Sequence, residues 1–223
     1  MAYATYDESI LGEGAFMTVR LTLVCAPAPA QRPVRFGVDA PLDERALRQT
    51  RALAGALPVN ATLYAAPSRR CGQTAAALGW EAVVEEAALR DIDMGNWRGR
   101  TLAAVAAEDE AGLGIWMKDP DAAPHGGESV AQLYRRVASW LGALPPDAGQ
   151  VLAVVEQAVA RAAVVRALDA PLPSFWRVDV PPLSSVQLSG RAGRWNLRMG
   201  TVLAGRLRGH DGEGSASGGG QYL

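Results

Sequence analysis

Short apolar runs alternate along the chain with longer stretches in which apolar residues recur every three or four positions. Two of these runs, 18–24 (TVRLTLV) and 151–155 (VLAVV), are rich in β-branched residues and are typical of strands buried on both faces of a parallel sheet. Weaker runs predict further strands at 61–65, 82–85, 178–188 and 194–199. The periodic stretches predict helices that begin near Asp43, Pro67, Thr101, Glu128 and Gln157, whereas prolines and glycines over 114–127 predict a loop.

Strands that alternate with helices favour an α/β fold, here a three-layer α/β/α sandwich around a mostly parallel central sheet. In such sheets ligands bind at the carboxyl ends of the strands. Three segments follow predicted strands and should meet there: Cys25-Ala26, residues 66–70 and Glu156-Gln157. The strand pattern alone therefore predicts one pocket bordered by these segments.

The composition fits one domain, which we place at residues 17–204, because 223 residues with 49% hydrophobic content can bury a single sizeable core. Residues 1–16 are expected to be an N-terminal extension, and the Gly- and Ser-rich stretch 205–223 a flexible tail. A net charge of −1 gives no basic footprint for nucleic acid or an anionic membrane, and no apolar run is long enough to span one. Two cysteines in the whole chain predict a reducing cytoplasm. The oligomeric state stays open, with a homodimer as one option.

Five segments resemble, in order, the motifs of the histidine phosphatase superfamily, whose members have a phosphoglycerate-mutase-like fold. They are LVCAPAP at 23–29, APSRRCGQTA at 66–75, LRDIDMGNWRG at 89–99, GES at 127–129 and VVEQAVAR at 154–161. The resemblance implies that Arg70 is a phosphate-binding arginine. It also implies that Asp91 stands at the position of the family's acidic proton donor.

The resemblance fails at the two positions that carry the family's chemistry. Ala26 stands where the family has its nucleophilic histidine, Cys25 replaces the preceding arginine, and Glu156 replaces the second histidine. Phosphoryl transfer needs a nucleophile and a cationic cluster. A carboxylate ~4 Å from a phosphate charge would repel it by about 4 kcal/mol at an effective dielectric near 20. The resemblance therefore implies a degenerate member, lacking both catalytic histidines, that is neither an ordinary phosphatase nor a mutase.

Two functional hypotheses follow. In the first, the chain is a repurposed enzyme in which Arg70 binds a small anionic metabolite, while Glu156, with Asp91 or Glu128, performs acid–base chemistry. An isomerisation, cyclisation, elimination or hydrolysis in a biosynthetic pathway would suit these groups and would need no cofactor. In the second, the chain is an inactive pseudo-phosphatase that binds a metabolite or a partner protein.

Other side chains are assigned to the pocket wall with a structural alternative for each. Besides Cys25, Ala26 and Gln157, we expect Trp97 and His125 to contact the ligand, although a loop histidine is more often solvated and a tryptophan more often packs in the core. Glu156 has the alternative of a simple ion pair with Arg70. One loop histidine does not make a metal site, so no metal is expected.

Overall fold

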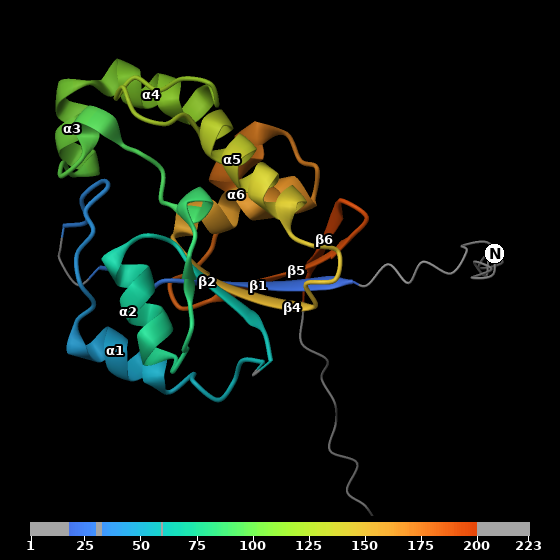
Figure 1. Ribbon diagram of the computed structural model, residues 1–223. Helices are drawn as coiled ribbons and strands as arrows, with labels where there is room; N and C mark the ends of the chain where they lie inside the picture. Colours follow the sequence, from blue (N-terminus) through green and yellow to red (C-terminus); the bar gives the residue numbers. More distant parts are fainter. Residues whose placement is uncertain (1–17, 30–32, 59, 200–223) are drawn as a thin grey trace, which may run out of the picture.

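A computed structural model describes residues 18–29, 33–58 and 60–199 and shows one six-stranded sheet (Figure 1). Its order is β3-β2-β4-β1-β5-β6. The neighbours among the first four strands of that order are parallel, whereas β5 pairs antiparallel with β1 and with β6. The strands are β1 (Val19–Cys25), β2 (Thr62–Ala65), β3 (Val84–Glu85), β4 (Gln150–Val155), β5 (Ser185–Arg191) and β6 (Arg194–Arg198). The predicted α/β class is confirmed. The predicted extension 1–16 and tail 205–223 lie outside the described residues.

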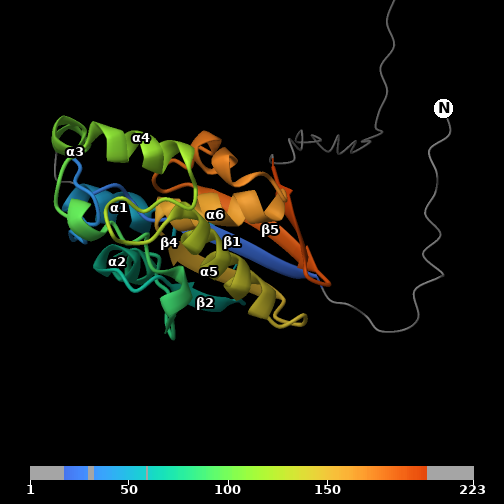
Figure 2. The same ribbon diagram turned by 90° about the horizontal axis from the view of Figure 1, so that it is seen from above.

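Helices cover both faces of this sheet. In Figures 1 and 2, α5 and α6 lie over one face, α1 and α2 over the other, and α3 and α4 lie toward the carboxyl ends of the parallel strands. The helices are α1 (Glu44–Arg51), α2 (Arg69–Ala77), α3 (Leu102–Glu108), α4 (Glu110–Lys118), α5 (Val130–Ala143) and α6 (Gln157–Ala167), with short 3-10 turns η2 (Ala87–Leu89), η3 (Gly95–Trp97) and η4 (Leu172–Arg177). None of the described helices combines the length and apolarity that a bilayer crossing requires.

Side-chain caps explain where most helices begin. Asp43 accepts a hydrogen bond from the Ala46 amide at 2.7 Å, and Thr101 accepts one from Ala104 at 3.1 Å. The start of α5 is two residues later than predicted, because Ser129 and Gln132 form a capping box and Glu128 lies outside the helix. These caps satisfy amide groups that the first helical turn would leave without partners.

Two predicted elements are wrong in extent. Residues 114–118, which were assigned to the predicted loop, belong to α4, which begins at Glu110. Asp109 caps this helix by accepting from the Gly112 amide at 2.9 Å, and the buried Trp116 side chain offsets the low helix propensity of glycine. Strand β5 begins only at Ser185 rather than at 178, because Pro181 and Pro182 have no amide hydrogen for the ladder.

The core follows the centre of the sheet. Residues 151–155 of β4 are fully buried between β1 and β2, and Leu21 and Leu23 of β1 are nearly so. Both central strands thus lie between the two helical layers, which is why their sequences lack polar alternation. Their carboxyl ends carry the side chains of the pocket described next.

Candidate functional site

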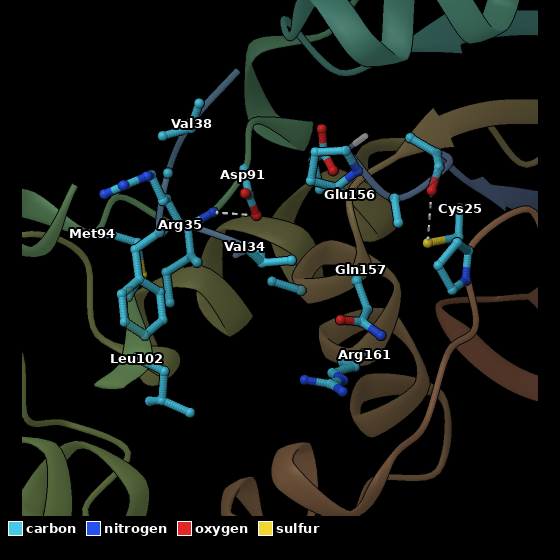
Figure 3. Close-up of a pocket in the computed structure, with 18 of the residues that line it drawn as sticks. Cys25, Val34, Arg35, Val38, Asp91, Met94, Leu102, Glu156, Gln157 and Arg161 are labelled. Carbon is cyan, nitrogen blue, oxygen red and sulfur yellow. Dashed lines mark hydrogen bonds between the residues drawn. The ribbon is translucent and has the colours of Figure 1, made fainter. Parts of the chain in front are cut away.

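A cavity of about 510 Å³ opens at the carboxyl ends of β1, β2 and β4 (Figure 3). The structure brings together there most of the predicted site: Cys25, Ala26, Arg70, Asp91, Glu156 and Gln157. A second cavity of about 310 Å³ adjoins it and shares Arg70, Asp91 and Glu156. These three residues therefore lie where the two cavities meet.

Glu156 directly follows β4 and is held in place by hydrogen-bond donors. The Arg70 guanidinium donates from Nη2 to Oε2 at 2.5 Å and from Nε to Oε1 at 3.3 Å. The hydroxyl of Ser68 donates to Oε1 at 2.9 Å, and the Cys71 thiol lies 3.7 Å from the same oxygen. Glu156 is 6% exposed. Its carboxylate is thus a buried, paired anion and not a free base, although the cavity around it is open.

Arg70 retains donors for a ligand despite this pair. It is the second residue of α2, behind the Ser68 cap, and its backbone amide contacts Asp39 at 3.3 Å. Burial alone would lower the pKa of its guanidinium, but the Glu156 carboxylate outweighs this effect and raises it. Within the described residues, hydrogen bonds engage its Nε and Nη2 atoms, so Nη1 remains available to an anion in the cavity.

Asp91 is the second carboxyl group of the cavity and has a strongly perturbed proton affinity. Burial, and then the negative charge of Glu156, raise its pKa to about 7, while the Ile92 amide that donates to Oδ1 at 2.9 Å acts in the opposite direction. A carboxyl group with this pKa holds a proton on about half of the molecules at neutral pH. Asp91 can therefore donate a proton to a leaving group.

The two cysteines of the chain are free and buried. Burial and the nearby Glu156 charge raise the pKa of the Cys25 thiol to about 12, and they raise that of Cys71 as well. Because the thiolate is the reactive form, neither cysteine is activated as a nucleophile near neutral pH.

Glu128 was predicted to share the pocket, but it does not line either of these cavities. It forms a two-point salt bridge with Arg136 of α5, with Nε–Oε1 at 2.9 Å and Nη2–Oε2 at 2.6 Å. The Nη1 atom of Arg136 donates to the carbonyls of Ala88 and Arg90, at 2.7 and 2.9 Å. The pair thus fastens the backbone that leads directly into Asp91, and sequence reasoning missed Arg136 altogether.

Trp97 and His125, also predicted to contact a ligand, lie instead in an aromatic cluster behind the cavity wall. Their ring centroids are 4.9 Å apart, and each ring packs edge-on against Trp116, which itself lines the cavity. His125 is 1% exposed, and its Nδ1 atom accepts from the Gly127 amide at 3.0 Å, so the ring is neutral with its proton on Nε2. Burial lowers its pKa.

Close backbone contact fixes this arrangement. The Asn96 amide donates to the His125 carbonyl and the Glu128 amide to the Asp93 carbonyl, both at 2.8 Å. A side chain on Gly95, whose φ is +44°, would meet the His125 carbonyl oxygen at 2.1 Å. The glycines of the GNW and HGGE segments therefore let two loops join, and the joined loops place Asp91 at the cavity.

Arg161 is a further cavity residue that the sequence-based assignment omitted. It lies on α6, four residues after Gln157 and hence on the same helical face, and Figure 3 shows both side chains along one wall below Glu156. Its spacing from Gln157 was the signal that could have identified it. Among the described residues, no group of three or more His, Cys, Asp or Glu side chains is arranged to hold a metal ion.

Comparison with known proteins matches residues 27–201 to the family model of the histidine phosphatase superfamily (branch 1). Glucosyl-3-phosphoglycerate phosphatase of Mycobacterium tuberculosis is 32% identical over 142 residues, which are 55% of this chain and 61% of that protein. A solved structure of a mycobacterial glucosyl-3-phosphoglycerate phosphatase has a TM-score of 0.68 at 26% identity and covers 81% of this chain and 97% of that one. The same enzyme has also been solved with inorganic phosphate.

The α-ribazole phosphatase from Shigella flexneri shares the fold, with a TM-score of 0.70 at 22% identity over 80% of this chain and 94% of that one. These relatives contradict the expectation of a non-phosphatase enzyme or an inactive pseudo-phosphatase, because the proteins that this chain resembles are phosphatases. The argument from the sequence motifs excluded too much, because it ruled out one route to hydrolysis and not the reaction itself. The family model matches more than half of the chain's length, and the chain therefore belongs to branch 1 of the histidine phosphatase superfamily.

Proposed function

We propose that this protein is a phosphatase that hydrolyses a small phosphorylated metabolite in the cavity at the carboxyl ends of β1, β2 and β4. The observation that carries the proposal is Asp91, a carboxyl group with a pKa of about 7 in the same cavity as the available Nη1 donors of Arg70. Family membership and the phosphate-bound structure of the mycobacterial relative support a phosphate ester as the ligand. The free thiols support the cytoplasm as its location.

The chemistry has to proceed without the family's two histidines, whose positions correspond to Ala26 and Glu156 in the motif comparison. A phosphohistidine intermediate has no acceptor atom at Ala26, and burial keeps the Cys25 thiol protonated. We therefore propose a single displacement. Water attacks phosphorus in line with the ester oxygen, the phosphorus–oxygen bond to the alcohol breaks, and the products are the free alcohol and inorganic phosphate.

Each of the three central residues has a proposed role in this step. Arg70 binds equatorial phosphate oxygens through Nη1, while its Nε and Nη2 stay on Glu156. Asp91 gives its proton to the departing ester oxygen, the attacking water carries its two protons onto the phosphate, and one of these then returns to the Asp91 carboxylate. Glu156 is a positioning residue, since its carboxylate fixes the Arg70 guanidinium. Its negative charge weakens phosphate binding, so the Nη1 donor of Arg70 has to outweigh that repulsion.

Phosphate release from esters of different leaving groups tests the proposal. The panel contains 4-nitrophenyl phosphate, phenyl phosphate, glucosyl-3-phosphoglycerate and α-ribazole phosphate, and phosphate and alcohol are quantified together. Removing a general acid costs about 10²–10⁴-fold when the leaving group needs the proton. Asp91→Asn should therefore lose much more activity on phenyl phosphate than on 4-nitrophenyl phosphate, whose phenolate leaves readily without a proton.

Arg70→Gln should lose activity on every ester of the panel, because phosphate binding is common to all of them. Both variants, purified in the same way, also control for a contaminating host phosphatase. Absence of phosphate release from the whole panel would refute the proposal. Release that both variants retain at the level of the unmodified protein would refute it as well, because the activity would then belong to a contaminant.

A further inference from the structure

The cavity is far more apolar than a sugar phosphate requires. Beyond Arg70, Asp91 and Glu156, its walls come from the 34–38 loop, from α3 and α4, and from η4. Figure 3 shows Val34, Met94 and Leu102 opposite Gln157 and Arg161. Val34, Leu102 and Met117 leave half or more of their surface exposed, so they contribute apolar area that nothing else in the described residues covers. The larger apolar residues of the lining include Phe36, Ile92, Leu113, Trp116, Phe175 and Trp176.

Beyond Arg70, Asp91 and Glu156, only Arg35, Gln157 and Arg161 of the described residues offer charged or amide side chains to sugar hydroxyls along these walls. A hydroxyl moved from water to an apolar surface without a hydrogen bond loses its water partners with no replacement, which disfavours binding. The Gln157 amide nitrogen already donates to the Val180 carbonyl at 2.7 Å. An aromatic or aliphatic group gains instead from the same walls, because it releases water from both surfaces. The lining thus selects for an apolar leaving group.

Arg161 is a polar exception on this wall. Its Nε atom is buried and has no hydrogen-bond partner within the described residues, and its guanidinium lies 5.8 Å from the centre of the Phe175 ring. Burial lowers its pKa, and the charge of Asp179 offsets that effect only in part. Because Arg161 lines the cavity, an anionic ligand group there would pair with this partly desolvated cation.

The spacing between Glu156 and Arg161 along α6 gives a length scale for the ligand. Glu156 is the N-cap of α6 and Arg161 is five residues further on, which corresponds to about 7.5 Å along the helix axis. One aromatic ring with substituents at opposite ends spans a distance of this order. A phosphate near Arg70 and a carboxylate near Arg161 can therefore belong to one molecule whose ring lies against the apolar wall.

We propose that the substrate is the phosphate ester of an aromatic or similarly apolar hydroxy acid, with the ring on the apolar wall and the carboxylate on Arg161. This assignment rests on the proposed phosphatase function and adds the class of its leaving group. Arg161 is then a specificity residue that contacts the substrate away from the reacting bond.

The test compares 4-carboxyphenyl phosphate with its neutral isostere 4-carbamoylphenyl phosphate and with glucose 6-phosphate, by kcat/KM. The unmodified protein should prefer the carboxylate over the amide about tenfold, the effect of one charge-assisted hydrogen bond in a partly open site. Arg161→Met should abolish that preference and leave the amide ester unchanged. Arg166→Met, on the same helix but outside the cavity lining, is the matched control and should keep the preference.

Calorimetric binding of the product 4-hydroxybenzoate separates this inference from the phosphatase proposal. Arg161-dependent binding without hydrolysis of any ester would support the ligand class and refute the phosphatase. Hydrolysis with glucose 6-phosphate preferred would overturn the ligand class and keep the phosphatase. An equal loss on all esters in Arg161→Met would also overturn the inference, because the residue would then act only on the fold.

Discussion

Replacing Asp91 by asparagine is expected to remove activity and, at the same time, to stabilise the fold above neutral pH. Asparagine has nearly the same shape, and its side-chain oxygen can still accept from the Ile92 amide as the carboxylate does at 2.9 Å. What it lacks is the negative charge. That charge is costly in the folded state, because Asp91 is half-buried and faces the Glu156 carboxylate.

The size of the gain follows from the raised pKa. Asp91 titrates near 7 in the folded protein and near 3.8 in a free chain, a difference of about three pH units. Each unit corresponds to about 1.36 kcal/mol, which gives a ceiling of about 4 kcal/mol. Solvent screening at a partly exposed side chain reduces this to about 2 kcal/mol. The melting temperature of a chain of this size should then rise by about 4–8 °C.

The difference in unfolding free energy between Asp91→Asn and the unmodified protein depends on pH. Between about pH 4 and 7 the folded protein holds the Asp91 proton and the unfolded chain does not, so stability falls as pH rises through this window. The advantage of Asp91→Asn should therefore be absent near pH 4, grow to pH 7 and stay constant above it. Urea unfolding of both proteins at half-unit pH steps measures this difference directly.

Asp93→Asn is the matched control two residues away. The Gly95 amide donates to Asp93 at 3.0 Å and lowers the pKa of this exposed carboxyl group, so its replacement should destabilise the protein and not stabilise it. If Asp91→Asn showed the same free energy of unfolding as the unmodified protein from pH 5 to 8, the argument for a protonated Asp91 would fail. The proton-donor role would fail with it.

Three further predictions concern stability. Glu128→Gln breaks a buried salt bridge and should cost about 3 kcal/mol in urea unfolding, whereas Arg135→Met, in a pair whose side chains are 65% and 71% exposed, should cost under about 1 kcal/mol. Because burial lowers the pKa of His125 below its usual value near 6.5, the unfolded chain binds the extra proton, and stability should fall as pH falls below about 6.5. A His125→Gln variant that kept the same slope of melting temperature against pH would contradict this. Gly95→Ala should destabilise the fold by about 2–4 kcal/mol more than Gly99→Ala, since φ is positive at both sites but only Gly95 faces a backbone oxygen; equal melting temperatures would count against the loop contact.

The pocket was predictable from sequence because it depends on sheet geometry. Once β1, β2 and β4 are recognised as parallel strands, their carboxyl ends must meet, and Cys25, Arg70 and Glu156 lie at or shortly after those ends. The ion pair between Arg70 and Glu156 was among the alternatives for the same reason. Asp91, in contrast, was assigned to the pocket only from its motif, because no strand ends at it.

The errors have a different physical origin. Arg136 and Arg161 belong to helices in which an arginine that faces solvent and one that is buried by tertiary contacts look alike in sequence. Glu128 was assigned to the pocket because its motif, GES at 127–129, matches the family pattern. In the structure a salt bridge with Arg136 of α5 holds it outside the cavity. Helix α4 was missed because the burial of Trp116, a tertiary effect, offsets the local preference of its glycines.

The meeting of two cavities at Asp91 has a kinetic consequence. The alcohol formed by hydrolysis would occupy the apolar cavity, while inorganic phosphate would lie beside Arg70, where the polar cavity also opens. Either product can then dissociate first. Release in random order makes both products competitive inhibitors against the ester, whereas a site with a single exit would make the first product to leave a noncompetitive one.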